Sequence, residues 1–197
     1  FISLYENKER VTFLNRLVAE EDEEYMDFYI EPRQDGVSTA SKKFMQTSRF
    51  VHGSKNLPPN SAAWTAPIKV ETISLDTLIK QHGNPDFIKI DVEGYEYEVL
   101  SSLQTKQQAI CFEWHEESAE EMIRCAEHLH SLGYEEFGVI GYFDEGDIFE
   151  KVTYDDRADP YMTFPENYYP WEELATELLE NVCQPKRRVN YGMFFVR

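Results

Sequence analysis

Asp86-Phe87-Ile88-Lys89-Ile90-Asp91-Val92-Glu93-Gly94-Tyr95 is the stretch that decides the fold of this chain. Its apolar part, residues 87–92, is short and rich in β-branched side chains, as buried strands of parallel sheets are. Gly94 permits a tight turn into a helix that begins near Tyr95. Asp91 and Glu93 are therefore expected at the carboxyl end of a strand, where open α/β sheets bind their ligands.

The segments around this stretch alternate between strand and helix patterns. Residues 68–73 predict a strand and residues 76–81 a helix, with Ser74 or Asp76 as its N-cap and Gly83 beyond its end. Residues 109–114 predict a second buried strand, followed by a helix that Ser118 caps and that runs to about Leu132. The remaining patterns predict strands over residues 11–19, 26–30, 134–142, 148–153 and 189–196, and helices over residues 1–8 and 171–181.

This order of elements predicts a doubly wound α/β sheet with a C-terminal antiparallel hairpin that turns at residues 144–147. We expect one domain over residues 1–197. A single crossover helix joins the strands over residues 87–92 and 109–114, which makes them parallel neighbours or near neighbours. If they are adjacent, four side chains converge at one rim of the sheet: Asp91, Glu93, Glu113 and His115.

Composition excludes several function classes. The net charge of −18 argues against a surface for nucleic acid or for an anionic membrane. No apolar run reaches the roughly 18 residues that a membrane span needs, and no signal segment opens the chain. The three cysteines form no CxxC pair, which excludes a cysteine zinc site and suits a reducing compartment. We therefore expect a cytoplasmic protein.

The stretch IKVETISLDTLIKQHGNPDFIKIDVEGYEYEVLSSL resembles the core of the FkbM-type methyltransferases that depend on S-adenosylmethionine (SAM), which carry a TLD…DFIKIDVEG.E.EVL pattern. Three other segments match in order. VTFLNRLVA resembles the third strand of the family, FYI with DGVSTAS its inserted strand and serine-rich turn, and ICFEWH the strand that follows. The resemblance covers most of residues 11–115. It implies a Rossmann-like methyltransferase sheet, an enzyme, and SAM as its cofactor.

The resemblance also exposes a departure. Members of the family begin with a strand, a glycine-rich turn and a helix, then a strand whose acidic end takes the ribose hydroxyls of the cofactor. Neither the glycine-rich turn nor the strand with the acidic end precedes Val11, and Phe1 falls in the helix before the third strand. In the family the two missing strands lie between the third strand and the IDVEG strand, so their absence leaves a large unpaired edge. We therefore expect that an N-terminal segment has been omitted from this sequence and that the first strands are missing.

The candidate catalytic residues are Asp91, Glu93 and His115. Methyl transfer is an in-line displacement, so the protein mainly positions the acceptor and removes its proton. Asp91 and Glu93 can orient the acceptor or the amino group of the cofactor, and histidine is the side chain best suited to act as a base near neutral pH. The alternative is that Asp91 or Glu93 caps the following helix.

The resemblance implies that Asn15, Arg16 and Leu17 lie beside the adenine of SAM, with Asp91 as a further cofactor residue; ordinary strand packing is the alternative for the first three. Glu113 and His115 point to the same side of their strand. Together with Asp91 they can hold a divalent cation, although such mixed rims are common without a metal.

The aromatic residues of 154–171, together with nearby carboxylates, suit a sugar-like, glycan or other small hydroxylated acceptor. The alternative is a loop that its aromatic rings pin to the core. The leading hypothesis is a SAM-dependent O-methyltransferase. Two others stay open: a non-catalytic α/β binding module that has lost the cofactor site, and a metal-dependent transferase or hydrolase that uses Asp91, Glu113 and His115. Exposed strand edges also favour a homodimer.

Overall fold

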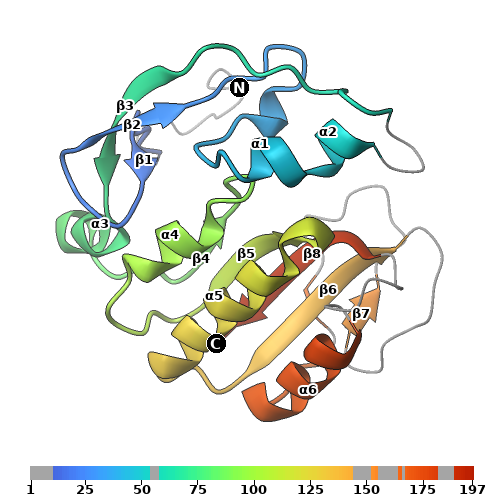
Figure 1. The fold of residues 1–197 in the computed structure, drawn as a ribbon. Helices are drawn as coiled ribbons and strands as arrows, with labels where there is room; N and C mark the ends of the chain where they lie inside the picture. The colour runs from blue at the N-terminus through green and yellow to red at the C-terminus, as the bar shows by residue number, and fades with distance from the viewer. Residues whose placement is uncertain (1–10, 54–57, 144–151, 155–163, 166, 182–188) are drawn as a thin grey trace.

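The structure is a computed structural model that describes residues 11–53, 58–143, 152–154, 164–165, 167–181 and 189–197 (Figure 1). Its strands are β1 (Leu17–Val18), β2 (Tyr25–Phe28), β3 (Ile68–Ile73), β4 (Ile88–Ile90), β5 (Ile110–His115), β6 (Phe137–Phe143), β7 (Val152–Tyr154) and β8 (Val189–Val196). Its helices are α1 (Phe44–Thr47), α2 (Arg49–His52), α3 (Leu75–His82), α4 (Glu96–Ser101), α5 (Ala119–Ser131) and α6 (Trp171–Asn181), with single 3-10 turns at Asp35–Val37 and Glu116–Ser118. The helix expected over residues 1–8 lies outside the described residues.

The two strands around the opening stretch are parallel neighbours, as predicted. β4 pairs with β5 in parallel, with Ile88 opposite Ile110 and Ile90 opposite Phe112. α4 lies in the connection between them. Because parallel strands end at the same edge of a sheet, the residues that follow β4 lie beside the last residues of β5.

The expected single sheet is two sheets. A three-stranded sheet has the order β1-β3-β2, and a five-stranded sheet has the order β4-β5-β8-β6-β7. The strand expected over residues 11–19 pairs only at Leu17 and Val18, and its partner is β3. Phe13 and Leu14 are 61% and 50% exposed, so the first part of this segment buries too little apolar surface to hold it in a sheet.

The predicted C-terminal antiparallel hairpin is wrong. β6 and β7 pair in parallel, with Val139 opposite Val152, and the predicted turn at residues 144–147 lies outside the described residues. The antiparallel partner of β6 is β8, which lies between β5 and β6. The last strand suits this interior position, because successive residues from Met193 to Val196 are at most 5% exposed and both faces of the strand are covered.

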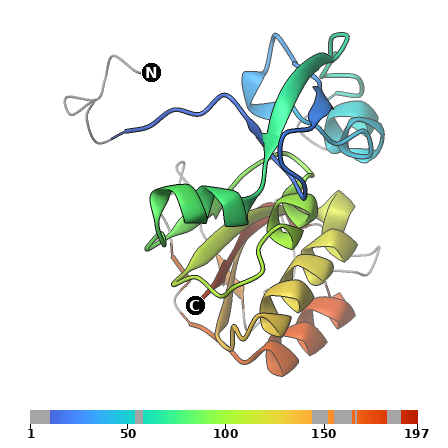
Figure 2. The same cartoon turned by 90° about the vertical axis from the view of Figure 1, so that its left-hand side faces the viewer.

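The main core packs one face of the five-stranded sheet against α4, α5 and α6 (Figure 2). The other face carries a smaller cluster that contains no helical residue among those described; its members are Cys111, Ile140, Met193, Phe195 and the partly buried Tyr168. Helices on both faces, which a doubly wound sheet requires, are therefore not found in the described part of the chain. α4, α5 and α6 all bring their apolar side chains to the same side.

The predicted ends of the helix after β3 are confirmed. The backbone N–H of Thr77 donates to Oγ of Ser74 over 3.2 Å, which makes Ser74 the N-cap of α3. Gly83 follows the helix with a φ of 92°, a conformation that glycine adopts without strain. None of the described helices is long and apolar enough to cross a membrane.

Candidate functional site

The turn after β4 is left-handed at two successive residues. Glu93 has a φ of 55° and Gly94 a φ of 84°. Residues other than glycine rarely adopt this backbone conformation, so contacts with other residues have to hold Glu93 in it. A Cβ atom at Gly94 would also lie 2.8 Å from Cβ of Phe44, so the turn needs glycine for both conformation and space. The glycine and the apolar residue of α1 therefore set the path of the backbone at the rim.

Glu96 holds this turn from the first position of α4. Its carboxylate accepts hydrogen bonds from the backbone N–H of Val92 over 3.2 Å and of Gly94 over 3.0 Å. Thr39 secures the other side by donating to the carbonyl of Glu93 over 2.8 Å. Sequence reasoning missed Glu96; an acidic residue directly after a glycine turn, in the first turn of a helix, is the signal that points to it.

Neither Asp91 nor Glu93 caps the following helix. α4 begins after Tyr95 and receives no side-chain cap. A capping hydrogen bond is therefore not observed for either residue, and the carboxylate of Glu96 instead holds the turn before the helix, at Val92 and Gly94. Asp91 and Glu93 are left with their side chains at the rim of the sheet.

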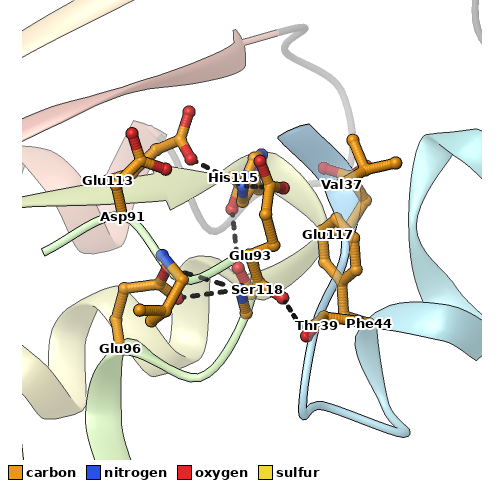
Figure 3. A network of polar contacts seen from close by, with 12 residues as sticks. Val37, Thr39, Phe44, Asp91, Glu93, Glu96, Glu113, His115, Glu117 and Ser118 are labelled. Atoms are coloured by element: carbon orange, nitrogen blue, oxygen red, sulfur yellow. Dashed lines mark hydrogen bonds and ion pairs between the residues drawn. The ribbon is translucent and has the colours of Figure 1, made fainter. Parts of the chain in front are cut away.

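Glu93, Glu113 and His115 meet at this rim (Figure 3). Nε2 of His115 lies 3.6 Å from Oε2 of Glu93 and 3.4 Å from Oε2 of Glu113. The side chains of Glu113 and His115 are 4% and 2% exposed, and that of Glu93 is 14% exposed. The two residues of β5 share a side because strand side chains repeat every two residues, so the expected convergence is confirmed.

Asp91 belongs to the edge of this group. Its carboxylate forms an ion pair with Lys89, and its side chain is 32% exposed. It also shares a hydrogen bond with Glu113. The residues that the structure gathers around His115 are therefore Glu93 and Glu113, whereas the expected cation ligands were Asp91, Glu113 and His115.

Burial dominates the electrostatics of the group. Burial and the charge of Glu113 raise the pKa of Glu93 to about 8, and burial and the charge of Asp91 raise the pKa of Glu113 to about 8. Burial raises the pKa of Glu96 to about 7. For Asp91 burial acts in the same direction, but hydrogen bonds with Lys89 and Glu113 outweigh it and lower the pKa. The proton of the Asp91–Glu113 pair therefore resides on Glu113.

The inserted segment between β2 and β3 covers one side of the group. The ring centroid of Phe44 lies 5.5 Å from that of His115. The backbone N–H of Arg49 donates to Oε1 of Glu117 over 2.6 Å, and Lys43 pairs with Glu121 over 2.7 Å. These contacts run from α1 and α2 to the residues that follow β5. The segment that carries the serine-rich turn is thus a wall of the site.

The proposed adenine residues lie elsewhere. Asn15 and Arg16 line a cavity of about 420 Å³. Arg16 pairs there with Glu71 over 3.0 Å. Leu17 begins β1, and neither Leu17 nor Asp91 is among the residues that line the cavity. The structure therefore groups Asn15 with Arg16 but does not bring them together with Asp91.

The aromatic stretch is described only in part, because residues 155–163 and 166 lie outside the described residues. Tyr169 exchanges two backbone hydrogen bonds with Phe137, and the ring of Phe164 lies 5.6 Å from that of Phe195. The described end of this stretch contacts the sheet, which favours a loop that its aromatic rings pin to the core for residues 164–165 and 167–171.

The family model described as the methyltransferase FkbM domain matches residues 3–136, which include the rim and the cavity beside Arg16 and end before β6. No curated protein and no solved structure matches the chain.

Proposed function

The chain belongs to the FkbM methyltransferase family, as its sequence resemblance indicated, and from this membership we propose that it transfers a methyl group from SAM to a hydroxyl oxygen. The acceptor is a small hydroxylated molecule or a glycan. The observation that supports the proposal is the group of carboxylates with one imidazole at the carboxyl ends of β4 and β5, within the residues that the family model matches.

When bound, SAM supplies a methyl group that is attached to a positively charged sulfur. The rest of the cofactor leaves as S-adenosylhomocysteine when the acceptor oxygen takes this methyl group. The chain's own residues must hold the acceptor in line and take the proton that its hydroxyl loses. Asp91 is anionic and partly exposed, so it accepts a hydrogen bond from the acceptor hydroxyl or from the cofactor's amino group.

His115 is the candidate base of the group. It lies between Glu93 and Glu113, whose oxygens are 3.6 Å and 3.4 Å from its Nε2. Glu93 is the most exposed of the three, so it lies on the side from which an acceptor approaches.

The cavity beside Arg16 fits the adenosyl part of the cofactor in size and chemistry. Its volume of about 420 Å³ lies within the range of small-molecule sites, about 300–1,000 Å³. Phe13 and Leu14 line it and are largely exposed, so they offer apolar surface to a flat ring. We assign Asn15 and Arg16 to the adenine side on the strength of the family resemblance, with Leu17 as their neighbour in β1.

Calorimetry with SAM on the intact protein, followed by an activity assay over hydroxylated acceptors, tests the proposal. We expect Asp91→Asn to lower the rate by about 10²–10⁴-fold, the range of acid–base and positioning groups. Asp86→Asn is the matched control, because Asp86 is exposed just before the same strand. Absence of SAM binding by the intact protein refutes the proposal, and equal rates for both variants remove Asp91 from the mechanism.

The same experiments separate the remaining hypotheses. A non-catalytic binding module binds an acceptor without SAM. A metal-dependent hydrolase or transferase loses its activity in chelator and needs no SAM. A SAM-dependent methyltransferase shows SAM binding and transfer of the methyl group to the acceptor.

A further inference from the structure

We propose that Glu93, Glu113 and His115 form a binding site for one divalent cation of the Mn²⁺ and Zn²⁺ class. The site lies where β4 and β5 end and where the inserted segment covers them. Binding of the ion depends only on these three side chains. Its use in catalysis rests on the proposed methyl transfer.

The spacing of the three ligand atoms suits such an ion. One oxygen or nitrogen atom from each residue lies within 4.8 Å of the others. Ligands at about 2.0–2.1 Å from a tetrahedral cation stand about 3.4 Å apart. The distances from Nε2 of His115 to Oε2 of Glu93 and of Glu113 are 3.6 Å and 3.4 Å, so two of the three spacings already match.

A second observation is the state of Glu113. Its side chain is 4% exposed, and its Oε2 accepts no hydrogen bond from the described residues although it points at His115. Oε2 of Glu93 accepts none either. A buried carboxylate oxygen without a donor costs folding free energy that a cation recovers. The alternative is a group that holds protons in place of an ion, and that alternative predicts no cation binding.

The ligand types select the class of ion. Carboxylate oxygens alone favour Mg²⁺ and Ca²⁺, whereas an imidazole nitrogen shifts the preference toward transition metals. Three protein ligands leave a further position for a hydroxyl oxygen of the acceptor. A hydroxyl bound to a dication loses its proton more readily. With Nε2 of His115 on the ion, this nitrogen no longer serves as the base. The partly exposed carboxylate of Asp91, beside Glu113, then takes the proton in its place.

Titration of the chelator-treated protein with MnCl₂ and with ZnCl₂ tests the site directly, by calorimetry and, for Mn²⁺, by electron paramagnetic resonance. We expect one ion per chain, and weaker binding of Mg²⁺ and Ca²⁺. Glu113→Gln and His115→Gln each lower the affinity at least about 10–100-fold, the loss that even outer-shell partners of metal ligands cause.

Glu136→Gln is the matched control. It removes the same charge, but Glu136 pairs with Arg197 at the surface, so this variant keeps the affinity of the parent protein. The control matters because a net charge of −18 attracts cations without a site. Circular dichroism and thermal unfolding in chelator establish that Glu113→Gln folds; we expect an unfolding temperature no lower than that of the parent protein, because the substitution removes a buried acid.

Three outcomes are decisive. If the parent protein binds neither Mn²⁺ nor Zn²⁺, or if Glu113→Gln and His115→Gln bind as tightly as Glu136→Gln, the site does not exist. If the protein binds SAM in chelator but no cation, only this inference fails. If it binds the cation but no SAM, the site stands and only the proposed methyl transfer fails.

Discussion

Glu96 determines which side chains meet at the rim, although it is not one of them. The left-handed turn at Glu93 and Gly94 has to be held by its surroundings, and the carboxylate of Glu96 provides two of the contacts. This turn is what carries the side chain of Glu93 to within 3.6 Å of His115. A residue outside the candidate ligand set therefore positions one of its members.

Removal of the Glu96 carboxylate should destabilise the protein. At pH 6 we expect Glu96→Ala to lower the free energy of unfolding by about 1–3 kcal/mol, because the backbone N–H groups of Val92 and Gly94 lose their acceptor. Glu98→Ala on the same helix is the control, since Glu98 is half-buried. Urea denaturation measures both variants, and equal losses would show that Glu96 does not hold the turn.

Two glycines with a similar φ, Gly83 and Gly94, allow the cost of conformational strain to be measured apart from the cost of crowding. Gly83 has a φ of 92°, and a Cβ added there would meet no atom within 4 Å, whereas a Cβ at Gly94 would meet Phe44 at 2.8 Å. We expect Gly83→Ala to cost about 1–2 kcal/mol in stability from strain alone. Gly94→Ala should cost about 1–3 kcal/mol more, because Phe44 must move. Chemical denaturation gives the difference, and a difference near zero contradicts the contact with Phe44.

At the scale of elements, the start of each helix shows which signals are local. Ser74 caps α3, and Ser118 precedes α5 without capping it. Both serines stand before an acidic first turn, so the sequence predicts the same role for each. The Oγ of Ser118 instead donates to the carbonyl of His115 over 3.3 Å, because the chain enters α5 through a 3-10 turn.

These two serines provide a matched pair of substitutions. We expect Ser74→Ala to lower the free energy of unfolding by about 1 kcal/mol, the usual effect of an N-cap. That corresponds to a fall of about 2–4 °C in the unfolding temperature. Ser118→Ala should cause a smaller change, since no backbone N–H of α5 depends on its Oγ. A differential scanning calorimeter resolves this difference; a larger loss for Ser118→Ala would contradict the observed cap.

The strands show what local patterns leave open. The strand predicted over residues 134–142 forms as β6 at Phe137–Phe143, but the partners of this strand are set by the rest of the chain. Apolar alternation specifies which face of a strand is buried and does not specify its neighbour. β8 enters between β5 and β6 because Met193 to Val196 need cover on both faces.

At the scale of the whole molecule, the buried carboxyl groups make stability depend on pH. Glu93 and Glu113 have a pKa of about 8 and Glu96 of about 7 in the folded chain, against 4.5 when unfolded. Between these values the folded state binds more protons than the unfolded state, so stability falls as pH rises. The depressed pKa of Asp91 acts in the opposite direction, but only as pH falls below its ordinary value of 3.8.

We therefore expect the chelator-treated protein to lose stability steadily from about pH 5 to pH 8. Urea midpoints across this window measure the effect. The double variant Glu93→Gln with Glu113→Gln should give a flatter profile, since these two groups no longer titrate. A urea midpoint that stays constant or rises with pH in the parent protein would contradict the raised pKa values of these buried carboxyl groups.

The sequence alone predicted the family, the parallel pairing of β4 with β5, the cap of α3 and the meeting of Glu113 with His115 at one rim. Each of these depends on neighbours in the chain: a single crossover helix, a residue three positions ahead, or the two-residue period of a strand. Such contacts follow from local geometry, so a pattern is enough to specify them.

Only the tertiary structure decided that Glu93, and not Asp91, joins His115, and that β8 separates β5 from β6. Both results depend on groups far apart in the chain. Thr39 and Phe44 of the inserted segment contact the turn at Glu93 and Gly94, and the last strand supplies apolar cover for both neighbours. The energy of such contacts comes from burial and hydrogen bonds between distant segments, which no local pattern in the sequence specifies.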